Sequence, residues 1–242
     1  MAAVRRWRLG LALAGCVLCE LWAPTPGWAF PPYRSTDADT AEEGMLELRG
    51  GLLGIERESQ RNAYFSPLLR ANLGLPYGAE FVSELEYRAD ESEVTDAALG
   101  FKWVPLRREL SLGVEALLLP PVSAGEDWAG VECVGLATFR KDDVFLHIDA
   151  GGFYDPRPET TEKGWKAGAI VEIERGRLRP GFEVFAKQVK HERLGLQAGP
   201  GIIVDFGLFD VRAGLRAGVT REAPDLELTI WITTKVRVWR AP

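Results

Sequence analysis

Two residues in the middle of the chain could take part in proton chemistry. His147 and Asp149 are two positions apart in an alternating segment, so a strand would point both side chains to one face. An imidazole near a carboxylate titrates near neutral pH, and such a pair could respond to pH. We favour the interpretation of a solvated or hydrogen-bonded structural pair.

An acidic cluster near the N-terminus offers oxygen ligands of the kind that Ca²⁺ prefers: Asp37, Asp39, Glu42 and Glu43. Its spacing matches no calcium-binding loop, which favours a flexible, solvated segment. The glycine-rich stretches 50–51 and 199–201 are not followed by a helical pattern, so they indicate bulges or close approaches in curved strands rather than phosphate loops. The sequence therefore predicts no metal and no cofactor.

The composition excludes several function classes. The chain has 242 residues, with Lys+Arg 29 against Asp+Glu 35, a net charge of −6. Nucleic acid is excluded as the main partner because phosphate binding requires a basic surface. With 2 His and 3 Cys, the chain lacks the residues for most metal sites and most histidine-based catalysis.

Residues 1–29 have the features of a secretory signal peptide. Three early arginines precede an uncharged apolar stretch, 9–19, and the small-x-small cleavage site Gly27-Trp28-Ala29 follows. We predict cleavage after Ala29. The alternative is a lipoprotein cleaved before Cys16, which the apolar residues beyond this cysteine disfavour. Cys133 is then the one cysteine of the mature chain, so no internal disulfide is expected.

From residue 44 onward, apolar and polar residues alternate with period two, which is the pattern of strands. In 209–220, for example, Phe, Val, Ala, Leu, Ala and Val occupy one face, and Asp, Arg, Gly, Arg, Gly and Thr the other. Most segments have 11–15 residues, longer than soluble strands of about 5–6 residues and long enough to cross a bilayer with a tilt. There are twelve such segments: 44–57, 62–75, 79–89, 93–105, 109–120, 128–140, 143–155, 163–175, 177–190, 194–206, 208–221 and 225–239.

The connections between these segments also alternate. Tight turns are expected at 76–78, 106–108, Asp142, Gly176 and Gly207, whereas the intervening connections tend to be longer and more polar. Outer-membrane barrels have short periplasmic turns and longer external loops. An even number of strands then returns both chain ends to the periplasmic side.

A soluble periplasmic β-sandwich or ligand-binding barrel would show the same alternation. Three features favour the membrane: segment length, aromatic residues at the segment ends, and polar faces that mix acids with bases. A spanning sheet must close, because lipid cannot satisfy an open edge. We predict an all-β protein, a single antiparallel up-and-down transmembrane β-barrel of about 12 strands at 44–239, with 10 strands as the fallback and a periplasmic leader at 30–43.

The chain also resembles a known family. Segment 30–49, which begins Phe-Pro-Pro-Tyr-Arg-Ser, is similar to the mature start of the phenol-degradation meta-pathway (MetA-type) outer-membrane barrels. Further matches follow in the same order, over nearly all of 30–239: 95–103, Leu119-Pro120, 147–151 and 215–225. The resemblance implies an outer-membrane β-barrel, often labelled a transporter, whose substrates are largely unestablished. The chain departs from the family in continuing for three residues after the terminal aromatic residue, Trp239.

The polar strand faces contain the candidate functional residues. They would form either a selectivity lining or a salt-bridge network that closes the lumen, and their mixed charges favour neither anions nor cations. With Arg216 in a watery lumen and Leu215 towards lipid, Leu215→Arg is expected to cost more stability than Arg216→Gln. The lumen-lining candidates are Glu84, Glu86, Asp96, Lys102, Glu115, His147, Asp149, Glu172, Glu183, Lys187, Arg212 and Arg216.

These observations predict passive passage or binding of a small solute, with a hydrophobic or aromatic solute as one option, by an exported barrel in the outer membrane. Six glycines on the predicted lumen faces would leave room for it: Gly100, Gly113, Gly168, Gly199, Gly214 and Gly218. No enzyme is predicted, because a hydrolase would need His147 on the lipid-facing side and His191 lies in a loop. The expected partners are outer-membrane lipid and the barrel-insertion machinery; the oligomeric state and a closed structural barrel stay open.

Overall fold

The computed structural model describes residues 32–58, 61–89, 92–122, 128–157 and 161–240. The expected signal peptide and both expected cleavage sites lie outside these residues. Within them, no helix has the length and apolar composition needed to cross a membrane. The described chain contains one short 3-10 turn, η1 (Pro76–Gly78), and twelve strands: β1 (Met45–Glu58), β2 (Arg61–Gly74), β3 (Ala79–Arg88), β4 (Glu93–Leu106), β5 (Leu110–Leu119), β6 (Gly130–Lys141), β7 (Val144–Asp155), β8 (Glu162–Ile173), β9 (Leu178–Val189), β10 (Gly195–Asp205), β11 (Phe209–Gly218) and β12 (Leu226–Arg237).

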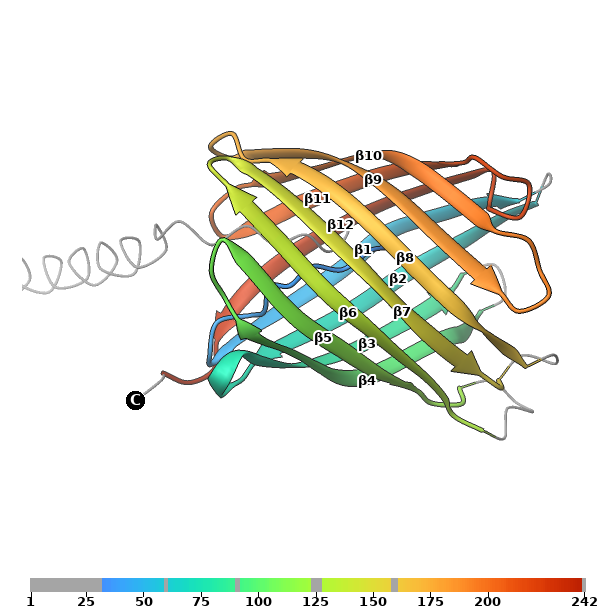
Figure 1. The fold of residues 1–242 in the computed structure, drawn as a ribbon, viewed down its shortest axis with the longest axis horizontal. Helices are drawn as coiled ribbons and strands as arrows, with labels where there is room; N and C mark the ends of the chain where they lie inside the picture. Colours follow the sequence, from blue (N-terminus) through green and yellow to red (C-terminus); the bar gives the residue numbers. More distant parts are fainter. Residues whose placement is uncertain (1–31, 59–60, 90–91, 123–127, 158–160, 241–242) are drawn as a thin grey trace, which may run out of the picture.

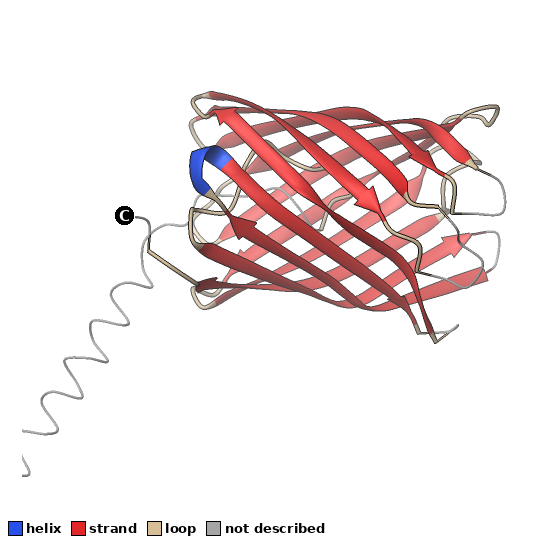
Figure 2. Ribbon diagram, turned by 90° about the horizontal axis from the view of Figure 1, so that it is seen from below, coloured by secondary structure: helices blue, strands red, loops and turns tan. Residues whose placement is uncertain are grey.

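The strands form a closed antiparallel barrel (Figure 1). Each strand pairs with its neighbours in the chain, and β1 pairs with β12 to close the ring. The wall is continuous in the second view as well (Figure 2). The predicted fold class is therefore confirmed, with twelve strands rather than the fallback of ten.

The two ends of the barrel differ in their connections. The end where β1 begins and β12 finishes also has the tight turns, including those at Asp142, Gly176 and Gly207 (Figure 1). These three residues have φ values of 53°, 62° and 87°, in the left-handed region that two-residue hairpins require. At the opposite end, longer stretches of sequence separate β5 from β6 and β7 from β8. We call this opposite end the loop end.

The outside of the wall is apolar. Leu99 and Ile148 are about half exposed although they lie in the middle of long strands, and so are Leu118, near the end of β5, and Leu215 at 41%. Exposed aromatic residues lie towards the strand ends: Trp103, Phe139, Tyr154, Trp165, Phe206 and Phe209. An apolar band with aromatic edges is the surface that a bilayer requires of a transmembrane barrel.

This orientation predicts how substitutions on the outer face act. Leu215 lies in the middle third of β11, so Leu215→Arg should cost about 2–4 kcal/mol of unfolding free energy. Leu208, 64% exposed in the β10–β11 turn, is the control: Leu208→Arg should cost about 0–1 kcal/mol, because it lies near the interface. Denaturant unfolding in phospholipid vesicles measures both. Equal costs would contradict the assignment of the lipid-facing surface.

The segment predicted as a solvated periplasmic leader lies instead inside the barrel. Ala38 has 0% of its surface exposed, and Tyr33, Ser35 and Ala41 are also buried. We call residues 32–43 the plug. The prediction was wrong because a ring of twelve strands encloses more space than its own side chains fill, and this polar segment occupies it.

Candidate functional site

The plug is bound to the wall through its own backbone. A buried N–H group needs an acceptor, and side chains of the inner wall supply it. Carboxylate acceptors make these hydrogen bonds stronger than neutral ones. The donors and acceptors are Arg34 N to Glu183 Oε2 (3.2 Å), Ser35 N to Glu183 Oε1 (2.7 Å), Thr36 N to Asp149 Oδ2 (3.3 Å), Ala38 N to Thr138 Oγ1 (2.9 Å) and Ala41 N to Glu80 Oε2 (2.5 Å).

Acidic side chains of the plug pair with basic residues of the wall. Lys102 Nζ lies 2.9 Å from Asp37 Oδ1, and the two side chains are 3% and 1% exposed. Asp39 pairs with Arg140 near the end where the turns lie. Asp37 and Asp39 of the acidic cluster therefore neutralise basic residues of the inner wall. This corrects the expectation of a solvated segment.

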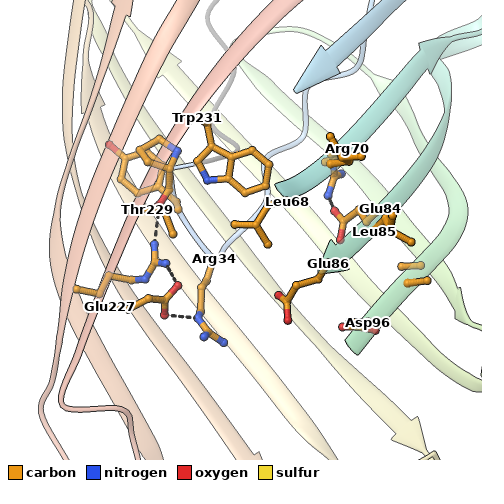
Figure 3. A pocket seen from close by; sticks show the side chains of 16 residues that line it. Arg34, Leu68, Arg70, Glu84, Leu85, Glu86, Asp96, Glu227, Thr229 and Trp231 are labelled. Carbon is orange, nitrogen blue, oxygen red and sulfur yellow. Dashed lines mark hydrogen bonds and ion pairs between the residues drawn. The ribbon is translucent and has the colours of Figure 1, made fainter. Parts of the chain in front are cut away.

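Arg34 is at the opposite side of the plug, where its side chain faces the loop end. Its Nε donates to Glu227 Oε2 over 2.7 Å (Figure 3), and its Nη2 donates to Glu56 Oε2 over 2.8 Å. The adjacent Glu227 raises the pKa of the Arg34 guanidinium above its usual range. Arg34 therefore remains charged and joins the plug to β1 and β12.

Arg216 connects the same region from the wall. It is 3% exposed and lies between two carboxylates, Glu227 and Glu183, the second at 3.2 Å. Its Nη1 also donates to the backbone oxygen of Pro32 over 2.6 Å. One guanidinium thus neutralises two wall acids and binds the plug main chain.

Tyr33 occupies a recess that glycines create in the wall. A Cβ atom at Gly201 would lie 2.5 Å from the Tyr33 ring, and one at Gly181 would meet its hydroxyl group. Burial raises the pKa of the Tyr33 phenol well above its usual value, and the nearby Glu172 adds to this. The phenol is therefore neutral at any physiological pH.

The six glycines predicted to leave room for a solute serve two other purposes. Gly168 and Gly214 face the plug, at Ser35 and Pro32 respectively. A Cβ at any of the other four would instead meet the backbone of a neighbouring strand or loop: Gly100, Gly113, Gly199 and Gly218. The interpretation of these glycines as free lumen space was wrong.

This recess makes a prediction for Gly201. Gly201→Val should displace the Tyr33 ring, because the three atoms nearest to the added Cβ all belong to Tyr33. Tyr33→Phe, which keeps the ring, is the control. In planar bilayers, Gly201→Val should raise the fraction of time in which the barrel conducts at least tenfold, an effect of about 1.4 kcal/mol. An unchanged conductance would show that the ring does not seat the plug.

All twelve predicted lumen residues lie on the inner wall. Four of them are less deeply buried and line cavities at the loop end: Glu84, Glu86, Asp96 and Lys187. The other eight are buried: Lys102, Glu115, His147, Asp149, Glu172, Glu183, Arg212 and Arg216.

His147 does not pair with Asp149, although both face inward. Its Nδ1 lies 2.9 Å from Thr138 Oγ1, and its Nε2 lies 3.5 Å from Glu172. A hydroxyl, an imidazole and a carboxylate in a row can support nucleophilic catalysis. His147 is 0% exposed, however, and Glu172 instead binds Arg179 at 2.6 Å. The row has no room for a substrate and is a structural network.

Several inner-wall residues escaped the sequence analysis. Arg70 is buried against Glu84 and Glu115 on the lumen face of β2, and its alternating position could have revealed it. Arg157 was expected in a loop, where no periodicity applies. It folds back to Asp155 and Asp96, each at 2.8 Å, and the hydrogen bonds that its guanidinium donates to Asp155 raise its pKa.

Two cavities remain between the plug and the loop end. One has a volume of about 240 Å³ and the other about 320 Å³. They share part of their lining, so we treat them as one vestibule: the shared residues are Arg34, Arg70, Glu84, Asp96 and Ala98. The inner face thus has two parts: a buried charged network around the plug, and the vestibule between the plug and the loop end.

Comparisons with known proteins bear on the fold. No family model and no curated protein matches the chain, so the resemblance to the phenol-degradation family stays a prediction. Among solved structures, the NanC porin superposes with a TM-score of 0.62 at 10% identity, over 79% of this chain and 100% of that one. Weaker matches include a porin (TM-score 0.44, 10% identity, 70% and 62% of the two chains) and the translocator domain of the autotransporter NalP from Neisseria meningitidis (0.44, 12%, 81% and 90%). The likeness to the NanC porin shows that this chain has the fold of an outer-membrane barrel.

Proposed function

We propose that the protein is an outer-membrane barrel that binds a small solute in its vestibule and lets it pass when the plug moves. One observation supports this most directly: residues 32–43 fill the interior between the vestibule and the end with the tight turns. The solute would enter from the loop end and meet the plug at Arg34. Passage and closure then belong to one mechanism.

The contacts of the plug suit a part that can leave. Most are hydrogen bonds and ion pairs with wall side chains, such as Glu183, Asp149 and Lys102. Water can satisfy the same groups once the plug withdraws, since a lumen of twelve strands is wide enough to admit it. The exceptions are the apolar contacts of Ala38 with Val104, Val134 and Leu136, and of Tyr33 with Ile170.

The location follows from the same proposal. An exported chain with an apolar outer band belongs in the outer membrane, with lipid and the insertion machinery as its partners. The signal peptide at 1–29 would direct it there.

Thiol labelling tests whether the plug occupies the lumen. In a Cys133→Ser background, Ala38→Cys should react with a membrane-impermeant thiol reagent at least tenfold more slowly than Trp128→Cys, because Ala38 is buried and Trp128 is 72% exposed. Planar-bilayer recordings of the same protein should show mostly closed barrels with brief openings. Fast labelling of position 38 together with a steady large conductance would overturn the proposal. A barrel that never opens and binds no solute would be a structural barrel.

A further inference from the structure

The lining of the vestibule is acidic. Among the described residues that line its two cavities, nine are carboxylates and six are cations. The carboxylates are Glu84, Glu86, Asp96, Glu115, Glu132, Asp149, Asp155, Glu162 and Glu227, and the cations are Arg34, Arg70, Arg157, Lys166, Lys187 and Arg216. A cleft with an excess of one sign attracts solutes of the other.

Each of these cations already has a carboxylate partner. The pairs are Arg34 with Glu56 and Glu227, Arg70 with Glu84 and Glu115, Arg157 with Asp96 and Asp155, Lys166 with Glu132, Lys187 with Glu162, and Arg216 with Glu183 and Glu227. An anionic solute would have to compete with these acids for every cation. The lining therefore disfavours anions.

Two acids of the lining differ in this respect: Asp149, which accepts a hydrogen bond from the plug backbone at Thr36 N, and Glu86. Within the described part of the chain, the Glu86 carboxylate forms no ion pair and accepts a hydrogen bond from Thr95 Oγ1 over 3.0 Å. It lines the smaller cavity and points into it (Figure 3). The side chain is thus placed to receive a cation that the protein itself does not supply.

An apolar wall faces the same space. Trp231 lies on the inward face of β12, together with Thr229 and Thr233. Leu68 from β2 lies beside it (Figure 3). Aromatic faces of this lumen already lie close to cationic side chains of the protein. The Arg34 guanidinium lies 6.0 Å from the centre of the Phe185 ring, and Lys187 Nζ lies 5.0 Å from that of Phe153. A cation over the face of an indole ring gains the same attraction. Among the rings of Trp, Tyr and Phe, the indole of Trp attracts cations most strongly.

We propose that the smaller cavity binds a small organic cation, an amine or quaternary ammonium ion with a short apolar body, with its charge between Glu86 and the Trp231 ring and its apolar part against Leu68. The volume of about 240 Å³ limits the solute to a few heavy atoms beyond the cationic group. This inference rests on the proposed function, because it names the solute class for the same vestibule. It concerns binding alone and does not require the plug to move.

Three probes of nearly equal shape test the charge preference. They are choline, its neutral isostere 3,3-dimethyl-1-butanol, and the anion 3,3-dimethylbutanoate. We would titrate each into the refolded full-length mature chain in a non-ionic detergent and follow binding by calorimetry. Choline should bind at least tenfold more tightly than the alcohol, and the anion should bind more weakly than both.

Two substitutions test the residues. Glu86→Gln keeps an acceptor for Thr95 and removes the charge, so it should weaken choline binding at least tenfold and leave binding of the alcohol unchanged. Trp231→Leu should weaken choline binding by about 2- to 30-fold. The matched controls are Glu192→Gln and Trp128→Leu, two exposed residues at the same end that line neither cavity. Both controls should bind choline as the unmodified chain does.

The outcomes separate this inference from the proposed function. Equal binding of choline and the alcohol, tighter binding of the anion, or an unchanged affinity after Glu86→Gln would overturn the cation site, while a plug that passes the labelling test would leave the proposed function in place. An equal loss after Glu192→Gln would also overturn it, because the effect would then come from net charge. Choline binding with the expected pattern in a barrel that never opens would support the site and contradict passage.

Discussion

Asp37→Lys should turn a mostly closed barrel into one that conducts for most of the time. In the unmodified chain, Asp37 lies against Lys102, and both side chains are almost fully buried. A lysine at position 37 would bring two ammonium groups together and remove the carboxylate that now pairs with Lys102. Breaking a buried pair in this way costs about 3–5 kcal/mol, which shifts the equilibrium between the docked and undocked plug by about 150- to 5,000-fold. Single-barrel recordings in planar bilayers measure the fraction of time spent open.

The charge-swapped double variant is the control for this prediction. Asp37→Lys with Lys102→Asp restores an opposite pair in the same place, so the barrel should return to a mostly closed state. If the single variant stays closed, the pair does not hold the plug. If the double variant stays open as well, the opening reflects damage to the plug rather than the lost attraction.

The strands were predictable because the alternation of apolar and polar residues is a local property of each strand. In β11, every second residue from Phe209 is apolar, and the local period fixes which side chains face lipid. The same parity placed Arg212 and Arg216 inside. The closure of the sheet into a barrel did not depend on any single residue. It was predictable because lipid contains no water to satisfy the backbone groups of an open sheet edge.

The plug was not predictable in this way. Residues 32–43 have no period, and their partners are far away in the chain: Ser35 and Glu183 are 148 positions apart. Polar residues such as Asp37 look solvated until a cavity of the right size surrounds them. The sequence left open whether the lumen charges form a selectivity lining or a closed network. The structure shows a buried charged network around the plug and cavities lined by charged residues towards the loop end.

Arg216 shows how the plug changes the energetics of the lumen. A water-filled lumen, as expected from the sequence, would make Arg216→Gln cost less stability than Leu215→Arg. In the structure, Arg216 is buried between Glu183, Glu227 and the backbone of Pro32. Removing one partner of a buried ion pair costs about 3–5 kcal/mol, comparable to or larger than the cost of about 2–4 kcal/mol for Leu215→Arg. We therefore expect Arg216→Gln to be at least as destabilising as Leu215→Arg in the unmodified chain.

The cost of Arg216→Gln should nearly vanish once the plug has left. In an Asp37→Lys background, water reaches Glu183 and Glu227, so the substitution should cost less than about 1 kcal/mol, as for an exposed pair. Leu215→Arg, one position earlier on the lipid side, is the control and should cost the same in both backgrounds. Unfolding in phospholipid vesicles gives the four free energies of each double-mutant cycle. Since distant, independent sites add, a coupling of about 2 kcal/mol or more for Arg216 together with additivity for Leu215 would show that the plug connects positions 37 and 216. Additivity for both would mean that Arg216 is stabilised by the wall alone.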